Sequence, residues 1–173
     1  MDTDRLASYT TNLDFYKGSH WPQTSRHRQL VFNYAKFSID KVTSFLMQGL
    51  GFACYPAEES DELKERARRA EGLLRQVYEE NKLQQIDWET ETDAAVLGDC
   101  CYKVTWDAEE KRVRITAPDI SGIFAWWLGD DVSRVWRVAS RYTLTQDEVQ
   151  LLYDRAIEKK TSTITELWTA RTF

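Results

Sequence analysis

The residue types that most often do chemistry at neutral pH are scarce in this sequence. It contains two histidines, His20 and His27. His27 and Asp40 are expected on one helix thirteen residues apart, which is too far along the axis for their side chains to touch. No Gly-x-Ser-x-Gly turn is present to hold a Ser-His-Asp arrangement, and no glycine-rich phosphate-binding motif occurs. We therefore expect no catalytic and no cofactor-binding residue, with a small hydrolase that uses His20 or His27 as a minor alternative.

The densest acidic run covers residues 87–93, with the sequence Asp-Trp-Glu-Thr-Glu-Thr-Asp. On a helix, Asp87 and Glu91 lie four residues apart, as do Glu89 and Asp93, and such pairs could ligate a hard divalent cation. Like charges at this spacing are far more often a solvent-exposed face that tolerates mild repulsion. The sequence therefore predicts an exposed acidic face and no metal site.

The cysteines are Cys54, Cys100 and Cys101, an odd number without Cys-x-x-Cys spacing. This pattern argues against a disulfide framework and against a zinc site. Adjacent cysteines on a strand point to opposite faces, so they could form a bridge only with strain. We expect reduced thiols that are mostly buried.

Four arginines could form a basic surface. Arg112 and Arg114 lie on one face of a predicted hairpin, and Arg137 and Arg141 are evenly spaced on a later strand. If these strands are neighbours, the arginines form a basic face that could contact nucleic-acid phosphate or an acidic surface of a partner subunit. An ordinary solvent-exposed sheet face is the other interpretation of the same pattern.

Apolar periodicity predicts three helices in the first hundred residues. An aromatic-containing arm, residues 1–25, precedes them and includes a turn at 16–22. The first helix is expected from Arg26 to about Gln48, capped by Ser25 and ended by Gly49. Its expected buried stripe comprises Leu30, Tyr34, Phe37 and Lys41, widened by Val31, Val42, Phe45 and Leu46.

A second helix is expected to start near Ser60, with acidic residues in its first turns and basic residues after them, as the helix dipole favours. A third is expected from about Leu83 to Gly98. Beyond Gly98 the apolar period changes from about 3.6 to 2, which predicts strands. A hairpin is expected around the turn at 107–110, followed by strands at 123–127, 134–143 and 162–169. Thr145 and Glu148 have the spacing of a capping box, which predicts a short helix before the last strand.

These elements predict an α+β fold in which two or three N-terminal helices pack on an antiparallel sheet with hairpins. The strand residues expected to face the helices are Tyr102, Val104, Trp106, Val113, Ile115, Trp136 and Val138. We expect one domain over residues 26–173, after the arm at 1–25.

The composition is that of a globular protein: 173 residues, 42% hydrophobic, 29% charged and 13% aromatic. This aromatic content argues against disorder, and the net charge of −5 argues against polyanion binding as the main activity. The N-terminus shows no secretory signal pattern. The longest stretch free of polar side chains, 123–129, is far shorter than the ~20 residues that a membrane helix needs, so we expect no membrane association.

Several motifs follow one another along the chain. The arm ends in Phe-Tyr-Lys-Gly at 15–18, and the helix that follows carries Asn-Tyr-Ala-Lys-Phe-Ser-Ile-Asp-Lys-Val-Thr-Ser-Phe-Leu-Met-Gln-Gly at 33–49. An acidic-to-basic helix precedes Asp-Ala-Ala-Val-Leu-Gly-Asp-Cys-Cys-Tyr-Lys-Val at 93–104. Ala117-Pro118, the aromatic strand 123–127 and an Asp-rich turn complete the pattern. This order of motifs resembles the N-terminal part of the portal proteins of tailed bacteriophages, over about residues 14–170.

The resemblance implies a structural subunit of a ring at one capsid vertex, dodecameric in the full-length protein and without enzymatic activity. Its partners would be other portal subunits, the packaging motor (terminase), capsid proteins and neck proteins, and double-stranded DNA would pass through it without sequence-specific binding. The expected location is the virion, with the bacterial host cytoplasm during assembly. The matched region resembles the outer wing, while the stem, clip and crown would follow Phe173, so we expect the chain to be a fragment. The alternative is an unrelated interaction domain that binds nucleic acid through Arg112, Arg114, Arg137 and Arg141.

Overall fold

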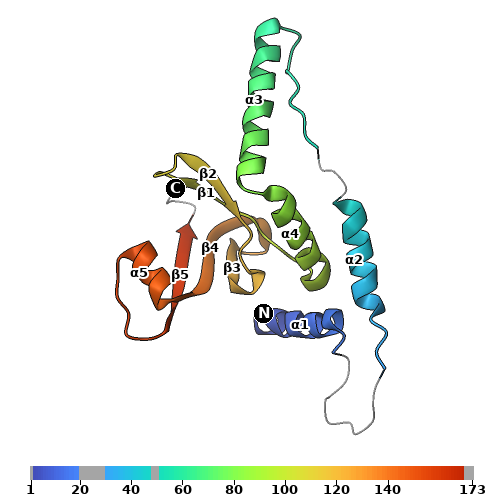
Figure 1. The fold of residues 1–173 in the computed structure, drawn as a ribbon, viewed down its shortest axis with the longest axis vertical. Helices are drawn as coiled ribbons and strands as arrows, with labels where there is room; N and C mark the ends of the chain where they lie inside the picture. The colour runs from blue at the N-terminus through green and yellow to red at the C-terminus, as the bar shows by residue number, and fades with distance from the viewer. Residues whose placement is uncertain (1, 20–29, 48–50, 170–173) are drawn as a thin grey trace. The chain divides into compact units, whose positions relative to one another are not determined.

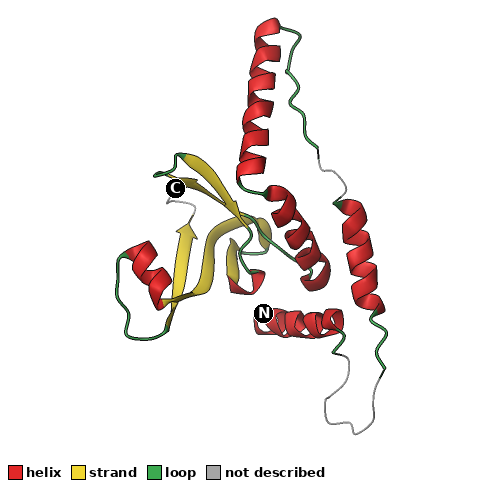
Figure 2. Cartoon of the chain, in the orientation of Figure 1, coloured by secondary structure: helices red, strands yellow, loops and turns green. Residues whose placement is uncertain are grey.

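The computed structural model describes residues 2–19, 30–47 and 51–169 (Figure 1). Its helices are α1 (Asp2–Lys17), α2 (Tyr34–Leu46), α3 (Asp61–Glu80), α4 (Leu83–Leu97) and α5 (Gln146–Tyr153), with a short 3₁₀ helix η1 (Ile120–Gly122). Its strands are β1 (Lys103–Asp107), β2 (Arg112–Thr116), β3 (Ile123–Leu128), β4 (Asp131–Thr145) and β5 (Thr161–Thr169). Figure 2 shows the helices in red and the strands in yellow, and the predicted α+β class with antiparallel sheets is confirmed.

The chain divides into two compact units, residues 1–117 and 118–173. The first contains α1–α4 and the β1–β2 hairpin, and the second contains a three-stranded sheet in the order β3-β4-β5 together with α5. This division falls inside the segment 26–173 that the sequence predicts to be one domain. Within the described ranges, no helix combines the length and hydrophobicity that a membrane crossing requires.

Helices α3 and α4 have the predicted bounds because local sequence signals define their ends. Ser60 precedes α3 with extended backbone angles, and Asp61 occupies the first turn, where the helix dipole favours a negative charge. Gly98 ends α4 with a φ of 95°, a conformation that glycine adopts without steric cost. Three ion pairs at i,i+4 spacing run along α3, including Arg75 to Glu71 at 2.8 Å.

The N-terminal region differs from the prediction, because residues expected to form an irregular arm are helical. Helix α1 is held by tertiary contacts that periodicity does not reveal. Tyr9 is buried and donates a hydrogen bond to Asp99, which also lies 3.6 Å from the guanidinium of Arg5. Burial, with the hydrogen bond to Asp99, raises the pKa of Tyr9 to about 12. The turn predicted at 16–22 begins only at Gly18, because Tyr16 and Lys17 belong to α1, and its residues 20–22 lie outside the described part of the chain.

Helix α2 begins at Tyr34, eight residues after the predicted start at Arg26. Its N-cap is Asn33, whose side-chain oxygen accepts from the backbone N–H of Lys36 at 2.9 Å. The backbone N–H of Met47 ends the helix by bonding to the carbonyl of Thr43. The predicted caps Ser25 and Gly49 lie outside the described residues.

The face of α2 predicted to be buried is exposed. Tyr34, Phe37 and Phe45 are 73, 66 and 61% exposed, whereas Thr43 on the other side of the helix is 1% exposed. Leu30, Val31, Lys41, Val42 and Leu46 of the predicted stripe are exposed as well. The physical reason is that the polar side of α2 is tied to α1 by hydrogen bonds, which leaves the aromatic side outward.

A single side-chain amide joins the helices of the first unit to its hairpin. Asn81, at the corner between α3 and α4, donates to the carbonyl of Val113 at 3.0 Å and accepts from the N–H of Ile115 at 2.8 Å. One residue of a neighbouring strand would make the same pair of bonds, so Asn81 caps the edge of β2 that does not pair with β1.

This attachment explains which hairpin residues are covered. Val113 and Ile115 on β2 are half-buried, as predicted, while Val104 and Trp106 on β1 are exposed. The prediction that Val104 and Trp106 face the helices is therefore wrong, because β2 is the strand that the α3–α4 corner holds. It is also wrong for Trp136, which is exposed, whereas Tyr102 meets helix α4 by donating a hydrogen bond to Asp87 at 2.7 Å.

The second unit is built around β4, which pairs with β3 on one side and β5 on the other. Ala139 and Ser140 at its middle are buried, as is Val149 on α5. The predicted capping box is confirmed, with Thr145 and Glu148 bonding to each other's backbone at the start of α5. Gly122 approaches β4 so closely that a Cβ atom would lie 2.2 Å from the carbonyl oxygen of Arg141.

Replacing Asn81 with alanine is expected to destabilise the chain by about 2–3 kcal/mol, because it removes two hydrogen bonds and leaves two backbone groups of β2 without partners. Chemical denaturation measures the effect. Asn12→Ala on the exposed side of α1 is the matched control, with an expected change within about 0.5 kcal/mol. Equal effects of the two substitutions would show that the corner amide does not hold the hairpin.

Replacing a glycine with alanine is expected to change the stability of the fold in opposite directions at Gly72 of the first unit and Gly122 of the second. Gly122→Ala forces the backbone of β4 away and is expected to cost more than about 2 kcal/mol. Gly72→Ala, in the middle of α3 with nothing within 4 Å of the added methyl group, is expected to stabilise by about 0.5–1 kcal/mol. Thermal unfolding of both variants measures the difference, and a neutral Gly122→Ala would contradict the close approach.

Candidate interaction site on the helical unit

A cluster of three side chains joins α1 to α2. The hydroxyl of Tyr16 donates to Asp40 at 2.7 Å and accepts from the ammonium of Lys36 at 3.0 Å, and Lys36 also pairs with Asp40 at 2.9 Å. The N-cap residue Asn33 donates to the backbone carbonyl of Tyr16 at 2.7 Å. The polar side of α2 is thereby fixed against the end of α1.

The electrostatics of this cluster favour a structural role. The hydrogen bonds of Tyr16 and Asp40 raise the pKa of Lys36, and those of Tyr16 and Lys36 lower the pKa of Asp40. Both groups therefore hold their charges across the neutral range, and neither is a proton donor or acceptor poised near pH 7. The cluster is an ion-paired joint between two helices.

The joint lies beside a hollow of about 580 Å³ whose wall includes Thr43, Trp88 and Glu89. The Thr43 hydroxyl is buried and has no hydrogen-bond partner among the described residues. Thr92 on the same wall bonds its hydroxyl back to the carbonyl of Trp88 at 2.9 Å.

The outward side of α2 carries an aromatic row. Tyr34, Phe37, Lys41 and Phe45 are spaced by three, four and four residues, so they share one side of the helix. Phe32 extends the row, its ring stacked on that of Tyr34 with 6.3 Å between the centroids. Lys41 lies within the row, with its ammonium 4.7 Å from the centroid of the Phe45 ring.

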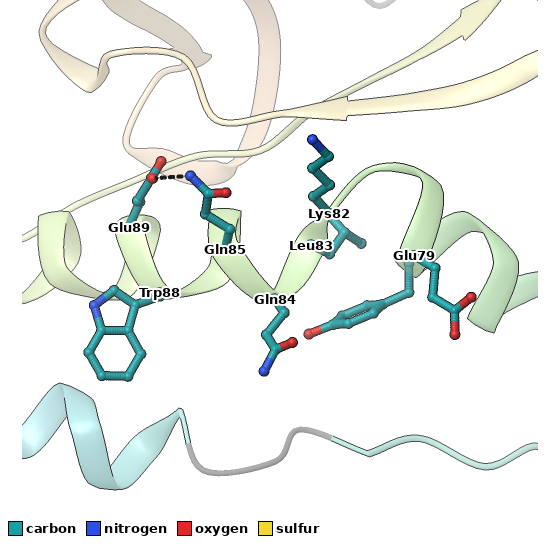
Figure 3. A pocket seen from close by; sticks show the side chains of 8 residues that line it. Glu79, Lys82, Leu83, Gln84, Gln85, Trp88 and Glu89 are labelled. Carbon is teal, nitrogen blue, oxygen red and sulfur yellow. Dashed lines mark hydrogen bonds between the residues drawn. The ribbon is translucent and has the colours of Figure 1, made fainter.

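A groove of about 640 Å³ lies at the α3–α4 corner (Figure 3). In Figure 3, Glu89, Gln85 and Lys82 lie on one side of α4, while Trp88 and Gln84 point to the other. Glu89 accepts a hydrogen bond from Gln85 at 2.9 Å. Tyr78 and Leu83 complete the apolar part of the lining, and Glu79 lies at the α3 end.

The acidic run at 87–93 is only partly the solvent-exposed face that the sequence predicts. Asp87 is half-buried and accepts hydrogen bonds from the hydroxyls of Tyr78 at 3.1 Å and Tyr102 at 2.7 Å. Burial and the bond to Asp87 raise the pKa of Tyr102 to about 12. Over the described ranges, no group of three or more histidine, cysteine or acidic residues could hold a metal ion.

The four arginines of the predicted basic face belong to two different sheets, so their strands are not hydrogen-bonded neighbours. On β2, Arg112 pairs with Glu110 and Arg114 lies 3.7 Å from Asp107. On β4, the guanidinium of Arg137 lies 4.2 Å and 4.7 Å from the ring centroids of Trp126 and Trp136. Arg141 lies over the ring of Phe124 at 5.0 Å. The two arginines of β2 thus contact acids of their own hairpin, and the two arginines of β4 contact aromatic rings of their own sheet.

The cysteines form no disulfide, but the prediction that they are mostly buried is wrong. Cys100 is exposed, and Cys54 and Cys101 are half-buried. Partial burial, followed by the negative charges of nearby acids, raises the pKa of Cys100, so its thiol is less nucleophilic than an ordinary cysteine. His20 and His27 lie outside the described residues, so the alternative that uses them stays a prediction.

The sequence missed the two surfaces that dominate this unit, the aromatic row and the corner groove. One signal was present: Lys41 stands in the middle of the stripe predicted to be buried, where a lysine would need a partner. No sequence pattern revealed the groove, because its lining comes from the junction of two helices.

No model of a known protein family matches the sequence, and no curated protein matches it.

The Tyr16 joint is expected to make stability depend on pH. The lowered pKa of Asp40 means that the pairing stabilises the fold above the ordinary carboxyl pKa and is lost as the pH falls through the folded value. Because the pKa of Lys36 is raised in the folded state, its pairing stabilises the fold below the ordinary lysine pKa. This stabilisation is lost as the pH rises through the pKa of Lys36 in the folded state. At pH 7 the denaturation midpoint of the wild type is therefore expected to be higher than that of Asp40→Asn. Below about pH 3 the two midpoints are expected to become equal.

Asp14→Asn on the exposed side of α1 serves as the control carboxylate, and Tyr16→Phe removes the hydroxyl that both charges share. The double variant Tyr16→Phe/Asp40→Asn is expected to lose less stability than the sum of the single changes, because the three groups act as one cluster. Additive losses that do not vary between pH 3 and pH 7 would contradict the joint.

Proposed function

We propose that this chain is part of a structural subunit of the portal ring of a tailed bacteriophage, contributing its outer wing region. The observation that carries the proposal is the reversed polarity of α2. Its aromatic row faces outward while Lys36, Asp40 and Thr43 face inward. A helix with this arrangement is suited to being covered by another molecule on its aromatic side.

The size of the exposed surface supports assembly. The rings of Phe32, Tyr34, Phe37 and Phe45 are each more than half exposed and together present on the order of 500 Å². Leu30, Val42 and Leu46 are more than half exposed as well. The largest apolar patch on a typical monomer is about 300–600 Å² and is often functional, and a standard interface buries about 800 Å² on each partner. The four rings alone would therefore supply more than half of one partner's share of a standard interface.

The position of the portal-like motifs in the fold is a second line of support. The Asn-bearing motif at 33–49 begins with the N-cap of α2, and Asn33 and Asp40 of this motif make the contacts to Tyr16. The motif at 93–104 spans the last residues of α4, the glycine that ends it and the start of β1. The motif residues thus lie at helix ends and joints, where a structural subunit depends on particular side chains.

In this role the chain acts by packing and not by catalysis. It would contribute to a dodecameric ring at one capsid vertex of the virion, assembled in the host cytoplasm. Duplex DNA would pass through the ring without sequence-specific contacts, and the packaging motor and neck proteins would attach to other parts of the same ring.

The proposal is tested on the product of the complete reading frame that encodes these residues. Electron microscopy of that purified protein is expected to show closed rings with a central channel. A protein that stays monomeric, or that stops at two-fold dimers, would overturn the proposal. The 173-residue chain alone is expected to be a monomer or a weak small oligomer by light scattering at micromolar concentration, because the stem and crown would carry much of the contact area.

A further inference from the structure

The aromatic row on α2 has the composition of a helix that lies in a groove. Its large side chains at 34, 37 and 45 share one side of the helix, as the anchors of an amphipathic helix in an apolar groove do, and Lys41 occupies the i+7 position of that side. Lys41 lies between these anchors, and it pairs with no carboxylate among the described residues. A surface that covers this row must therefore be apolar at its centre and offer a negative charge near Lys41.

The corner groove of the same chain meets both conditions. Trp88 is 44% exposed and, with Tyr78 and Leu83, provides the apolar lining of the groove. Two carboxylates, Glu79 and Glu89, lie at its edges against one cation, Lys82.

We propose that the aromatic row of α2 in one copy packs into the α3–α4 corner groove of the next copy, with Lys41 against Glu79 and Glu89. This inference rests on the proposed function, since it names the surface that receives α2 in the assembly. The two surfaces are different parts of one chain, so the contact is heterologous. Repeated contacts of this kind close into a ring when the rotation between neighbours allows it.

The same residues argue against a two-fold pairing of α2 with α2. Lys41 lies in the interior of the row, so an antiparallel pair of rows would bring two lysines close together in an apolar contact. The groove instead offers opposite charge, and its apolar lining would cover the rings on both sides of Lys41.

Charge reversal tests the proposal. Sedimentation velocity of the 173-residue chain at rising concentration measures its weak self-association, expected with a dissociation constant on the order of 100 μM. Lys41→Glu is expected to weaken association about tenfold, as is Glu79→Lys/Glu89→Lys, because each places like charges together. The triple variant Lys41→Glu/Glu79→Lys/Glu89→Lys is expected to recover to within about threefold of wild type.

Two further variants complete the design. Lys64→Glu, an equal charge change on the exposed part of α3, is the matched control and is expected to leave association unchanged. Phe37→Ser/Phe45→Ser is expected to abolish association while the helical circular dichroism stays the same, since both rings are exposed. Equal association by all variants, a triple variant no better than the double, or no wild-type association at about 1 mM would each overturn the proposal.

The outcome separates this inference from the portal proposal. If the protein encoded by the full reading frame forms rings, and the Lys41→Glu substitution does not change their assembly, the proposed function is retained and the contact is refuted. Charge-dependent association of this chain without rings from the full reading frame would support the contact and refute the portal function.

Discussion

The contact between Tyr16, Lys36 and Asp40 decides what the helical unit presents to its surroundings. One phenol hydroxyl bonds to an acid and a base that are one helical turn apart on α2. Each of these groups is exposed to an extent that makes an isolated ion pair weak. As a three-way cluster combined with the Asn33 cap, they fix the rotation of α2 about its own axis, and this rotation places the aromatic row outward.

The same principle operates at the α3–α4 corner. The hairpin β1–β2 is short, and the helices could in principle attach to either of its edges. The amide of Asn81 bonds to the edge of β2 and so determines which edge is attached. A short hairpin is marginally stable by itself. Its attachment through two backbone groups therefore determines both that it is ordered and that Val104 and Trp106 remain on its exposed side.

Polar contacts between elements, combined with exposed apolar side chains, suit a subunit of an assembly. Hydrogen bonds and ion pairs set the angles between elements, while large apolar side chains remain for neighbouring molecules, where interfaces are enriched in aromatic residues and arginine. In the second unit, Arg137 between two tryptophan rings and Arg141 over Phe124 show the same pairing of arginine with aromatic surface. The proposed subunit contact on α2 fits this pattern.

The sequence by itself determined the class of fold and most element boundaries after residue 60. Gly98 and the Thr145–Glu148 box are local signals, because a cap or a positive φ acts over one turn of backbone. Alternation of apolar residues likewise predicted the β1–β2 hairpin and the later strands, since its period of two reflects the pleat of each strand.

Only the tertiary structure decided which faces are covered and which elements meet. Helix α1 was missed because Tyr9 is buried by a contact with Asp99, ninety residues away. The face of α2 was predicted in reverse, since hydrophobic periodicity identifies an apolar side but not the molecule that will cover it. The four arginines were likewise divided between two sheets by strand pairing. Long-range hydrogen bonds and ion pairs determine which faces are covered and which elements meet. The two partners of each lie too far apart in the chain for a local sequence pattern to reveal them.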